Sequence, residues 1–225
     1  HVVDVFRFEP ADRQSPRHRH APAKHQRTAR APIGEVGEAD DAPSSDAHEL
    51  VEDTDDWYVR NIATGDVWYC GELARDFETF EGDSPTVPEL VSIDGSFKAG
   101  RDGDKPGILV PAEPYVGQAY RQEVSLGNAE DVAEVLSTSY VFGRRTNDPE
   151  SLDYMVPRRL ANKFCPDAEA RCLVTRDFTP LEPDVEERKY RAPGIGVFLE
   201  VNVTEGVIVE LVERNFDTDC PVAAP

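Results

Sequence analysis

The sequence has very little histidine. All five stand at its N-terminal end, as His1, His18, His20, His25 and His48, and residues 49–225 contain none. Structural zinc sites are built from Cys and His, and the four Cys include no Cys-x-x-Cys pair. Ser-His-Asp and Cys-His catalysis needs an imidazole base beside the nucleophile. We therefore expect neither a structural zinc site nor a histidine-dependent catalytic site in residues 49–225.

Long apolar runs and positive charge are also scarce. No run approaches the roughly 20 apolar residues of a membrane-spanning helix. The chain has 24 Lys and Arg against 44 Asp and Glu, which gives a formal net charge of −20. Nucleic acids are bound through phosphate contacts that need a basic surface. We therefore expect no membrane span and no nucleic-acid partner.

The first part of the chain differs from the rest in composition. Residues 1–30 hold seven Lys and Arg against three Asp and Glu. Almost no large apolar side chain follows until residue 45, so burial cannot offset the roughly 1–2 kcal/mol per residue that ordering costs. We predict a disordered or loosely attached arm over residues 1–48, basic and then acidic, and a single β-rich domain over residues 49–225. Because the chain begins at His1 rather than Met, we also expect a processed or truncated product.

Short β-favouring runs separated by turns fill most of the remaining chain. Trp57–Val59 and Val67–Cys70 flank a turn that contains Gly, which predicts a hairpin. Val197–Val203 and Val207–Val212 predict a second hairpin at the C-terminal end. The 15 Gly and 18 Pro suit many turns. The pattern predicts an all-β fold, either an antiparallel sandwich or a partly open β-barrel.

Two segments are less clear. Asn128–Ser137 fits a helical stripe with an Asn cap as well as a strand, and we favour the strand because the neighbouring segments contain no other helix. Residues 143–170 form a polar insertion. Its apolar residues could make a short helix or a packed loop: Leu152, Tyr154, Met155, Val156 and Leu160.

Several motifs follow one another in order along the body of the chain. They are Glu49–Tyr58, Gly65–Glu72, Gly95–Ile108, Val116–Glu123, Asn128–Leu136, Thr179–Pro183, Lys189-Tyr190 and Ala192–Gly196. Together they resemble a family of uncharacterised exported bacterial β-rich proteins over most of residues 49–142 and 172–213. The resemblance implies an antiparallel β fold and a secreted or cell-envelope location in a bacterium, and it brings no activity. Residues 1–48 and 143–170 depart from the family pattern.

Cysteine usage fits export. Cys165 and Cys172 lie seven residues apart in a polar segment, and we predict a local disulfide between them. Cys70 and Cys220 could pair or remain free, because four cysteines allow three connectivities.

Two sets of residues are candidate sites. Trp57, Tyr58, Trp68 and Tyr69 could form a platform for a carbohydrate or apolar ligand, or pack in the core. Neighbours in a strand point to opposite faces, so at most half of these rings share a surface. A second set lies in Gly-rich loops and could bind calcium weakly or simply form turns: Asp94, Asp102 and Asp104. We expect no other cofactor.

The sequence assigns no catalytic residue. In a chain with 44 Asp and Glu, two carboxylates at a suggestive spacing carry little information. We therefore favour a non-enzymatic exported protein with a structural or binding role at the cell envelope, where it would meet a small ligand or an envelope partner. The alternative is a carrier or binding protein for an apolar or carbohydrate ligand, and a carboxylate-based hydrolase comes third.

Overall fold

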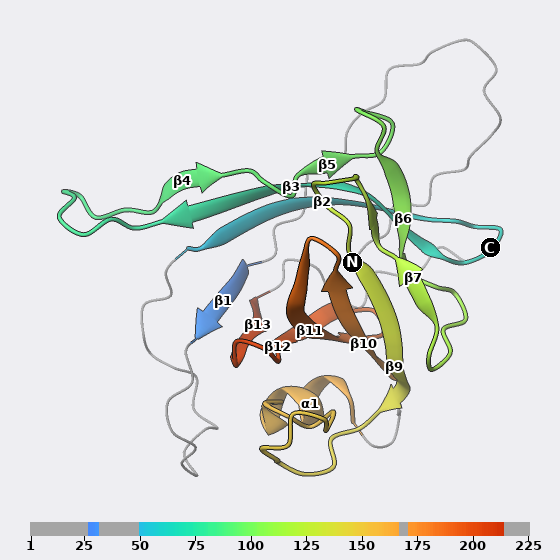
Figure 1. The fold of residues 1–225 in the computed structure, drawn as a ribbon. Coiled ribbons are helices and arrows are strands. Elements are labelled where there is room, and N and C mark those ends of the chain that lie inside the picture. The colour runs from blue at the N-terminus through green and yellow to red at the C-terminus, as the bar shows by residue number, and fades with distance from the viewer. Residues whose placement is uncertain (1–26, 32–49, 167–170, 214–225) are drawn as a thin grey trace, which may run out of the picture.

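The computed structural model describes residues 27–31, 50–166 and 171–213. These residues form two antiparallel sheets that do not close into a barrel (Figure 1). In order across the sheet, the seven-stranded sheet consists of β1 (Arg27–Ala31), β13 (Val207–Glu213), β12 (Gly196–Asn202), β11 (Glu182–Ala192), β10 (Cys172–Thr179), β9 (Val132–Tyr140) and β7 (Ala119–Arg121). The all-β antiparallel fold expected from the sequence is confirmed.

The second sheet is organised around one long strand, β3. In order, it consists of β2 (Glu52–Arg60), β3 (Val67–Glu78), β6 (Lys105–Val110) and β8 (Glu123–Val124), with β4 (Glu89–Ser92) and β5 (Phe97–Lys98) also paired to β3. In Figure 1 this sheet crosses above the seven-stranded sheet, and the β3–β4 hairpin extends beyond it. The predicted hairpin between residues 57–59 and 67–70 is the β2–β3 pair.

The other local predictions hold as well. The C-terminal hairpin is β12–β13, which pairs Leu199 with Glu210 and Asn202 with Val207. The segment that fitted both a helix and a strand is β9, and its Ala133 and Val135 are fully buried. β9 pairs with β10 on one side and with β7 on the other. This pairing makes the segment a strand, although its apolar residues also fit the spacing of a helix.

The insertion between β9 and β10 contains the one helix of the described residues, α1 (Arg158–Phe164). No helix in this part of the chain is long and apolar enough to cross a membrane. Leu160 and Ala161 of α1 are buried against Tyr190 and Phe198 of the seven-stranded sheet. The predicted disulfide between Cys165 and Cys172 is present and joins the end of α1 to the start of β10.

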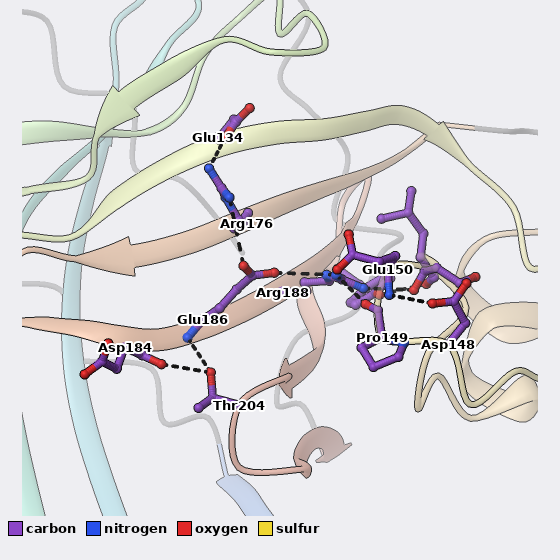
Figure 2. A network of polar contacts seen from close by, with 12 residues as sticks. Glu134, Asp148, Pro149, Glu150, Arg176, Asp184, Glu186, Arg188 and Thr204 are labelled. Atoms are coloured by element: carbon purple, nitrogen blue, oxygen red, sulfur yellow. Dashed lines mark hydrogen bonds and ion pairs between the residues drawn. The ribbon is translucent and has the colours of Figure 1, made fainter.

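Arg188 hydrogen-bonds to the insertion from the face of the sheet that packs against α1. From β11 it donates to the carbonyl oxygens of Ser151 at 2.8 Å and Pro149 at 2.7 Å. Its guanidinium also lies 3.5 Å from Glu186 Oε1, and Figure 2 shows the row continuing from Glu186 to Arg176 on β10. Through these contacts Arg188 holds the insertion, which has little regular structure, over one face of the sheet.

Alternation along β11 gives the sheet two different faces. Arg188 and Tyr190 point toward α1, whereas Glu187, Lys189 and Arg191 face the six-stranded sheet. Part of the space between the sheets is apolar, since Tyr120, Ala133, Val135 and Leu173 pack there against Ile108 and Val110. The rest of that space is polar and forms the candidate site.

The N-terminal segment differs from expectation at one point. Arg27–Ala31 pairs with β13 as an edge strand, although its composition predicted no regular structure. A strand at an edge needs only backbone pairing on one side, which composition does not reveal. The remainder of the predicted arm over residues 1–48 lies outside the described residues.

Candidate functional site

A cavity of about 810 Å³ lies between the two sheets. Its lining comes from β2, β3, β6 and β8 of one sheet and from β10, β11, β12 and β13 of the other, with residues of the adjoining loops. Twelve Asp and Glu residues line it, against Lys189 and Arg191 as the basic ones. The cavity is therefore polar and acidic, unlike the continuous apolar cavity that would favour a carrier of apolar ligands.

The β2 wall follows simple strand alternation. Glu52, Thr54, Asp56 and Tyr58 all line the cavity, while the intervening Trp57 does not. On β3, Tyr69 and Glu72 both line the cavity although they lie three residues apart.

The register between β2 and β3 explains this spacing. Trp57 pairs with Gly71 and Tyr58 with Tyr69, so β3 carries one extra residue at this point. Gly71 has a φ of 141°, and a Cβ there would lie 2.4 Å from the Phe97 carbonyl oxygen, so only glycine fits beside β5. The resulting bulge turns Tyr69 and Glu72 to the same face.

Tyr69 joins two carboxyl groups on this wall. Asp56 and Glu72 are register partners, and the Tyr69 hydroxyl lies 2.6 Å from Asp56 Oδ1 and 2.8 Å from Glu72 Oε2. A phenol has one proton, so it donates to only one of the two oxygens at a time. Because two ionised carboxylates opposite each other would repel, the arrangement is best satisfied when one of the carboxyl groups keeps a proton.

Burial raises the pKa values of these acids. It raises the pKa of Glu72 to about 7; the Tyr69 hydrogen bond lowers this pKa in part, and the nearby Asp56 carboxyl group adds a smaller rise. Burial also raises the pKa of Glu123 to about 9, and the carboxyl groups of Asp131 and Glu72 add to this rise. The pKa of Asp56 and that of Asp131 are raised as well, again chiefly by burial. Part of the acidic lining therefore holds protons at neutral pH.

The positive charge of Lys189 lowers the pKa of acidic residues on both sheets. Its register partners are Thr175 on β10 and Glu200 on β12, and Glu200 is the main cause that raises the pKa of the Lys189 ammonium well above its usual value. Within the described residues its single ion pair is with Asp177, whose Oδ2 lies 3.8 Å from Nζ. The Lys189 side chain is 21% exposed and lines the cavity.

Arg191 belongs to a separate buried cluster. It donates to Thr175 Oγ1 at 2.6 Å and lies 3.5 Å from Asp177 Oδ2. Thr175 donates to Asp177, and Gln122, with its amide nitrogen toward Asp177, donates to the same carboxylate at 3.0 Å and accepts from Arg191 at 3.2 Å. Arg191 is thus committed to Thr175, Asp177 and Gln122 and does not neutralise the acidic lining.

The four aromatic residues singled out from the sequence divide between two faces. Tyr58 and Tyr69 line the cavity, with ring centroids 5.0 Å apart. Trp57 and Trp68 are not among the lining residues, and Trp57 lies under Lys98, whose Nζ is 4.4 Å from the ring centroid. The structure thus brings half of the predicted platform to the cavity, and its role in ligand binding stays a prediction.

The three aspartates considered for calcium are not brought together. Asp94 lines the cavity, whereas the Asp104 carboxylate accepts from the Lys98 backbone at 3.3 Å and Asp102 is in a turn with a φ of 50°. Nowhere in residues 27–31, 50–166 and 171–213 do three or more His, Cys, Asp or Glu side chains lie close enough to hold a metal ion. Weak calcium binding at these loops stays a prediction.

The remaining cysteines give no further site. Cys70 makes no disulfide with a described residue, and burial raises the pKa of its thiol. Its possible partner Cys220 lies outside the described residues.

The acidic cavity itself was not predicted from the sequence. Residues 52–56 are polar at every position, which predicts a strand exposed to water on both faces. Residues 186–191 are charged at every position except Tyr190, so their sequence does not show which side chains face the cavity. Comparison with models of protein families, with curated proteins and with solved structures finds no match to this chain.

Proposed function

We propose that the protein is a non-enzymatic exported protein of the bacterial cell envelope that binds a small polar ligand between its two sheets. The observation that carries the proposal is the cavity of about 810 Å³ with polar side chains converging from both sheets. Small-molecule sites are cavities of this order. A sandwich with a purely structural role would fill this space with apolar side chains.

Two features support export. The disulfide between Cys165 and Cys172 is the kind of bond that persists in oxidising compartments. The formal net charge of −20 supports solubility outside the cell.

A carboxylate-based hydrolase is less well supported. Glycoside hydrolysis needs two carboxyl groups on opposite sides of the bond that is cleaved. Asp56 and Glu72 are instead neighbours on one wall, and both contact the Tyr69 hydroxyl. This pair therefore lacks the opposed geometry that glycoside cleavage needs.

The proposal is tested with a variant that fills the cavity. Val197 lines the cavity, so Val197→Trp places an indole in the space where the ligand would lie. Val87→Trp is the matched control, because Val87 is 47% exposed in the loop before β4. Calorimetric titrations use three probes of different chemistry, namely 1,8-diaminooctane, maltotriose and decanoate.

We expect at least one polar probe to bind the parent protein and the Val87→Trp variant. Its affinity should fall at least about tenfold in Val197→Trp, because the cavity is occupied. Circular dichroism confirms that both variants are folded. Failure of every probe to bind, or equal binding to both variants, would overturn the proposal.

A further inference from the structure

The acidic side chains that line the cavity greatly outnumber the basic ones. Both basic lining residues, Lys189 and Arg191, make their ion pairs with Asp177, which is not itself among the lining residues. Within the part of the chain that the structure describes, several lining carboxyl groups make no ion pair: buried Glu123, half-buried Glu72, Glu187 and Glu200, and exposed Glu52. A buried carboxylate without a cation is costly, so the group either keeps its proton or acquires a positive partner.

Glu123 shows this shortage most directly. It is 9% exposed, lines the cavity, and has no ion-pair partner among the described residues. Beyond burial, the carboxyl groups of Asp131 and Glu72 raise its pKa, and the Lys189 charge and a backbone hydrogen bond with Asp131 offset that rise only in part. A group so placed is better satisfied by a cation in the cavity than by any side chain around it.

The spacing of the acids among the described residues favours a larger cation over a compact metal ion. Calcium requires six to eight oxygens at about 2.3–2.6 Å. The described residues contain no group of three or more candidate ligands close enough together, and the acids are spread over the walls of the cavity. A longer cation with separated charges can reach carboxyl groups on both sheets at once. Tyr58 and Tyr69 also line this wall, and their rings lie 5.0 Å apart between centroids.

We infer that the cavity binds an organic cation with two or more separated amino or guanidino groups, and that binding releases protons from the acidic lining. The inference rests on the proposed function and names its ligand class.

The proton release follows from the geometry of the β2–β3 wall. The Tyr69 hydroxyl contacts both Asp56 and Glu72, an arrangement that favours one retained proton on the pair. A cation that approaches this pair favours the fully ionised form, and the proton leaves. The titratable groups that face Glu72 and Glu123 are Glu52, Asp56 and Tyr58 on β2, Tyr69 on β3, Asp131 just before β9, and Lys189 on β11.

The test uses a pair of probes that differ only in charge. 1,8-diaminooctane and 1,8-octanediol have the same chain length, and the first carries two positive charges at about pH 7.5. Each is titrated at about 0.15 M salt, which screens surface charge. Repeating the titrations in two buffers of different ionisation enthalpy gives the number of protons released.

We expect the diamine to bind with proton release and the diol to bind at least about tenfold more weakly. Glu123→Gln should weaken diamine binding several-fold and lower the number of protons released, whereas exposed Glu113→Gln should change neither. Lys189→Met should strengthen diamine binding, since it removes a competing cation. If Lys189→Met does not fold, Glu123→Gln decides the question, because Gln keeps the size of the side chain.

The outcomes separate the two proposals. Binding of the diol or maltotriose without binding of the diamine, lost in Val197→Trp, would overturn the cation class and leave the cavity as the binding site. Diamine binding that is unchanged in Val197→Trp and Glu123→Gln would mean attraction to the acidic surface and would overturn the inference. If no probe binds, both proposals fail.

Discussion

Tyr69 and Asp56 are joined by a hydrogen bond of 2.6 Å on the β2–β3 wall of the cavity. Tyr69 also contacts Glu72 at 2.8 Å, so its hydroxyl is the one group that connects this pair of register-matched acids. Without it, Glu72 would lose its hydroxyl partner, while Asp56 would keep its hydrogen bond with Tyr58.

Tyr69→Phe should therefore lower the free energy of unfolding by about 1–3 kcal/mol, the range for leaving a buried polar group unsatisfied. Urea denaturation monitored by circular dichroism measures the change. Tyr115→Phe is the control, because Tyr115 is 64% exposed, and it should have an effect within about 0.5 kcal/mol. Equal stability of Tyr69→Phe and the parent protein would contradict this role for the hydroxyl.

The acidic lining should make stability fall as pH rises. In the folded protein Glu72 loses its proton at about pH 7 and Glu123 at about pH 9, whereas both do so near pH 4.3 in the unfolded chain. The folded state therefore binds these protons more tightly. Their stabilising contribution is complete below about pH 4 and is lost as pH rises through the folded pKa values. We expect the free energy of unfolding to decrease between about pH 5 and pH 9.

Glu123→Gln should reduce this pH dependence. The amide cannot ionise, so at about pH 9 the variant should be more stable than the parent protein by about 1–3 kcal/mol, with a smaller difference at pH 5. Denaturant titrations across this pH range measure both values, and exposed Glu113→Gln serves as the control. A parallel pH profile for Glu123→Gln and the parent would exclude Glu123 as a source of the slope.

The disulfide should contribute modestly to stability. Cys165 and Cys172 are seven residues apart, and a loop this short corresponds to about 2–3 kcal/mol in the chain-entropy model. Replacing both by Ala should lower the free energy of unfolding by about that amount. Hydrogen exchange should increase most in α1 and the segment before it. Alkylation without reductant, followed by mass spectrometry, should leave Cys165 and Cys172 unmodified in the parent protein.

Arg188 should hold the insertion in place. Its side chain is 6% exposed and donates to the carbonyl groups of Pro149 and Ser151. Arg188→Met keeps much of the apolar volume but removes these hydrogen bonds, so we expect a loss of about 2–4 kcal/mol. Backbone exchange in residues 148–156 should rise in the same variant. Exposed Arg158→Met is the matched control and should leave both measurements near those of the parent.

Local sequence patterns predicted the strands better than they predicted what the strands face. The β2–β3 and β12–β13 hairpins follow from β-favouring runs on either side of a turn, and β9 follows from its neighbours. The Cys165–Cys172 disulfide follows from a short separation, because few geometries are open to so short a loop. The two hairpins and the disulfide depend on interactions that are close in the sequence, whereas β9 is fixed by its pairing with β10 and β7.

The cavity depends on contacts that are distant in the sequence. Glu52 on β2 and Glu200 on β12 line the same space only because the two sheets stack there. Residues 52–56 of β2 are all polar, so their sequence cannot distinguish a face that lines an internal cavity from one in contact with bulk water. The β3 bulge at Gly71 also breaks the alternation that would have placed Tyr69 and Glu72 on opposite faces.

Both tryptophans of the chain, Trp57 and Trp68, lie on β2 and β3. Among the described residues the seven-stranded sheet has none, so intrinsic tryptophan emission reports the environment of only one wall of the cavity. Far-ultraviolet circular dichroism, in contrast, records the strands of both sheets. Coincident unfolding curves from the two signals would mean that the walls come apart in a single step, whereas an earlier fluorescence change would mean that the six-stranded sheet opens first.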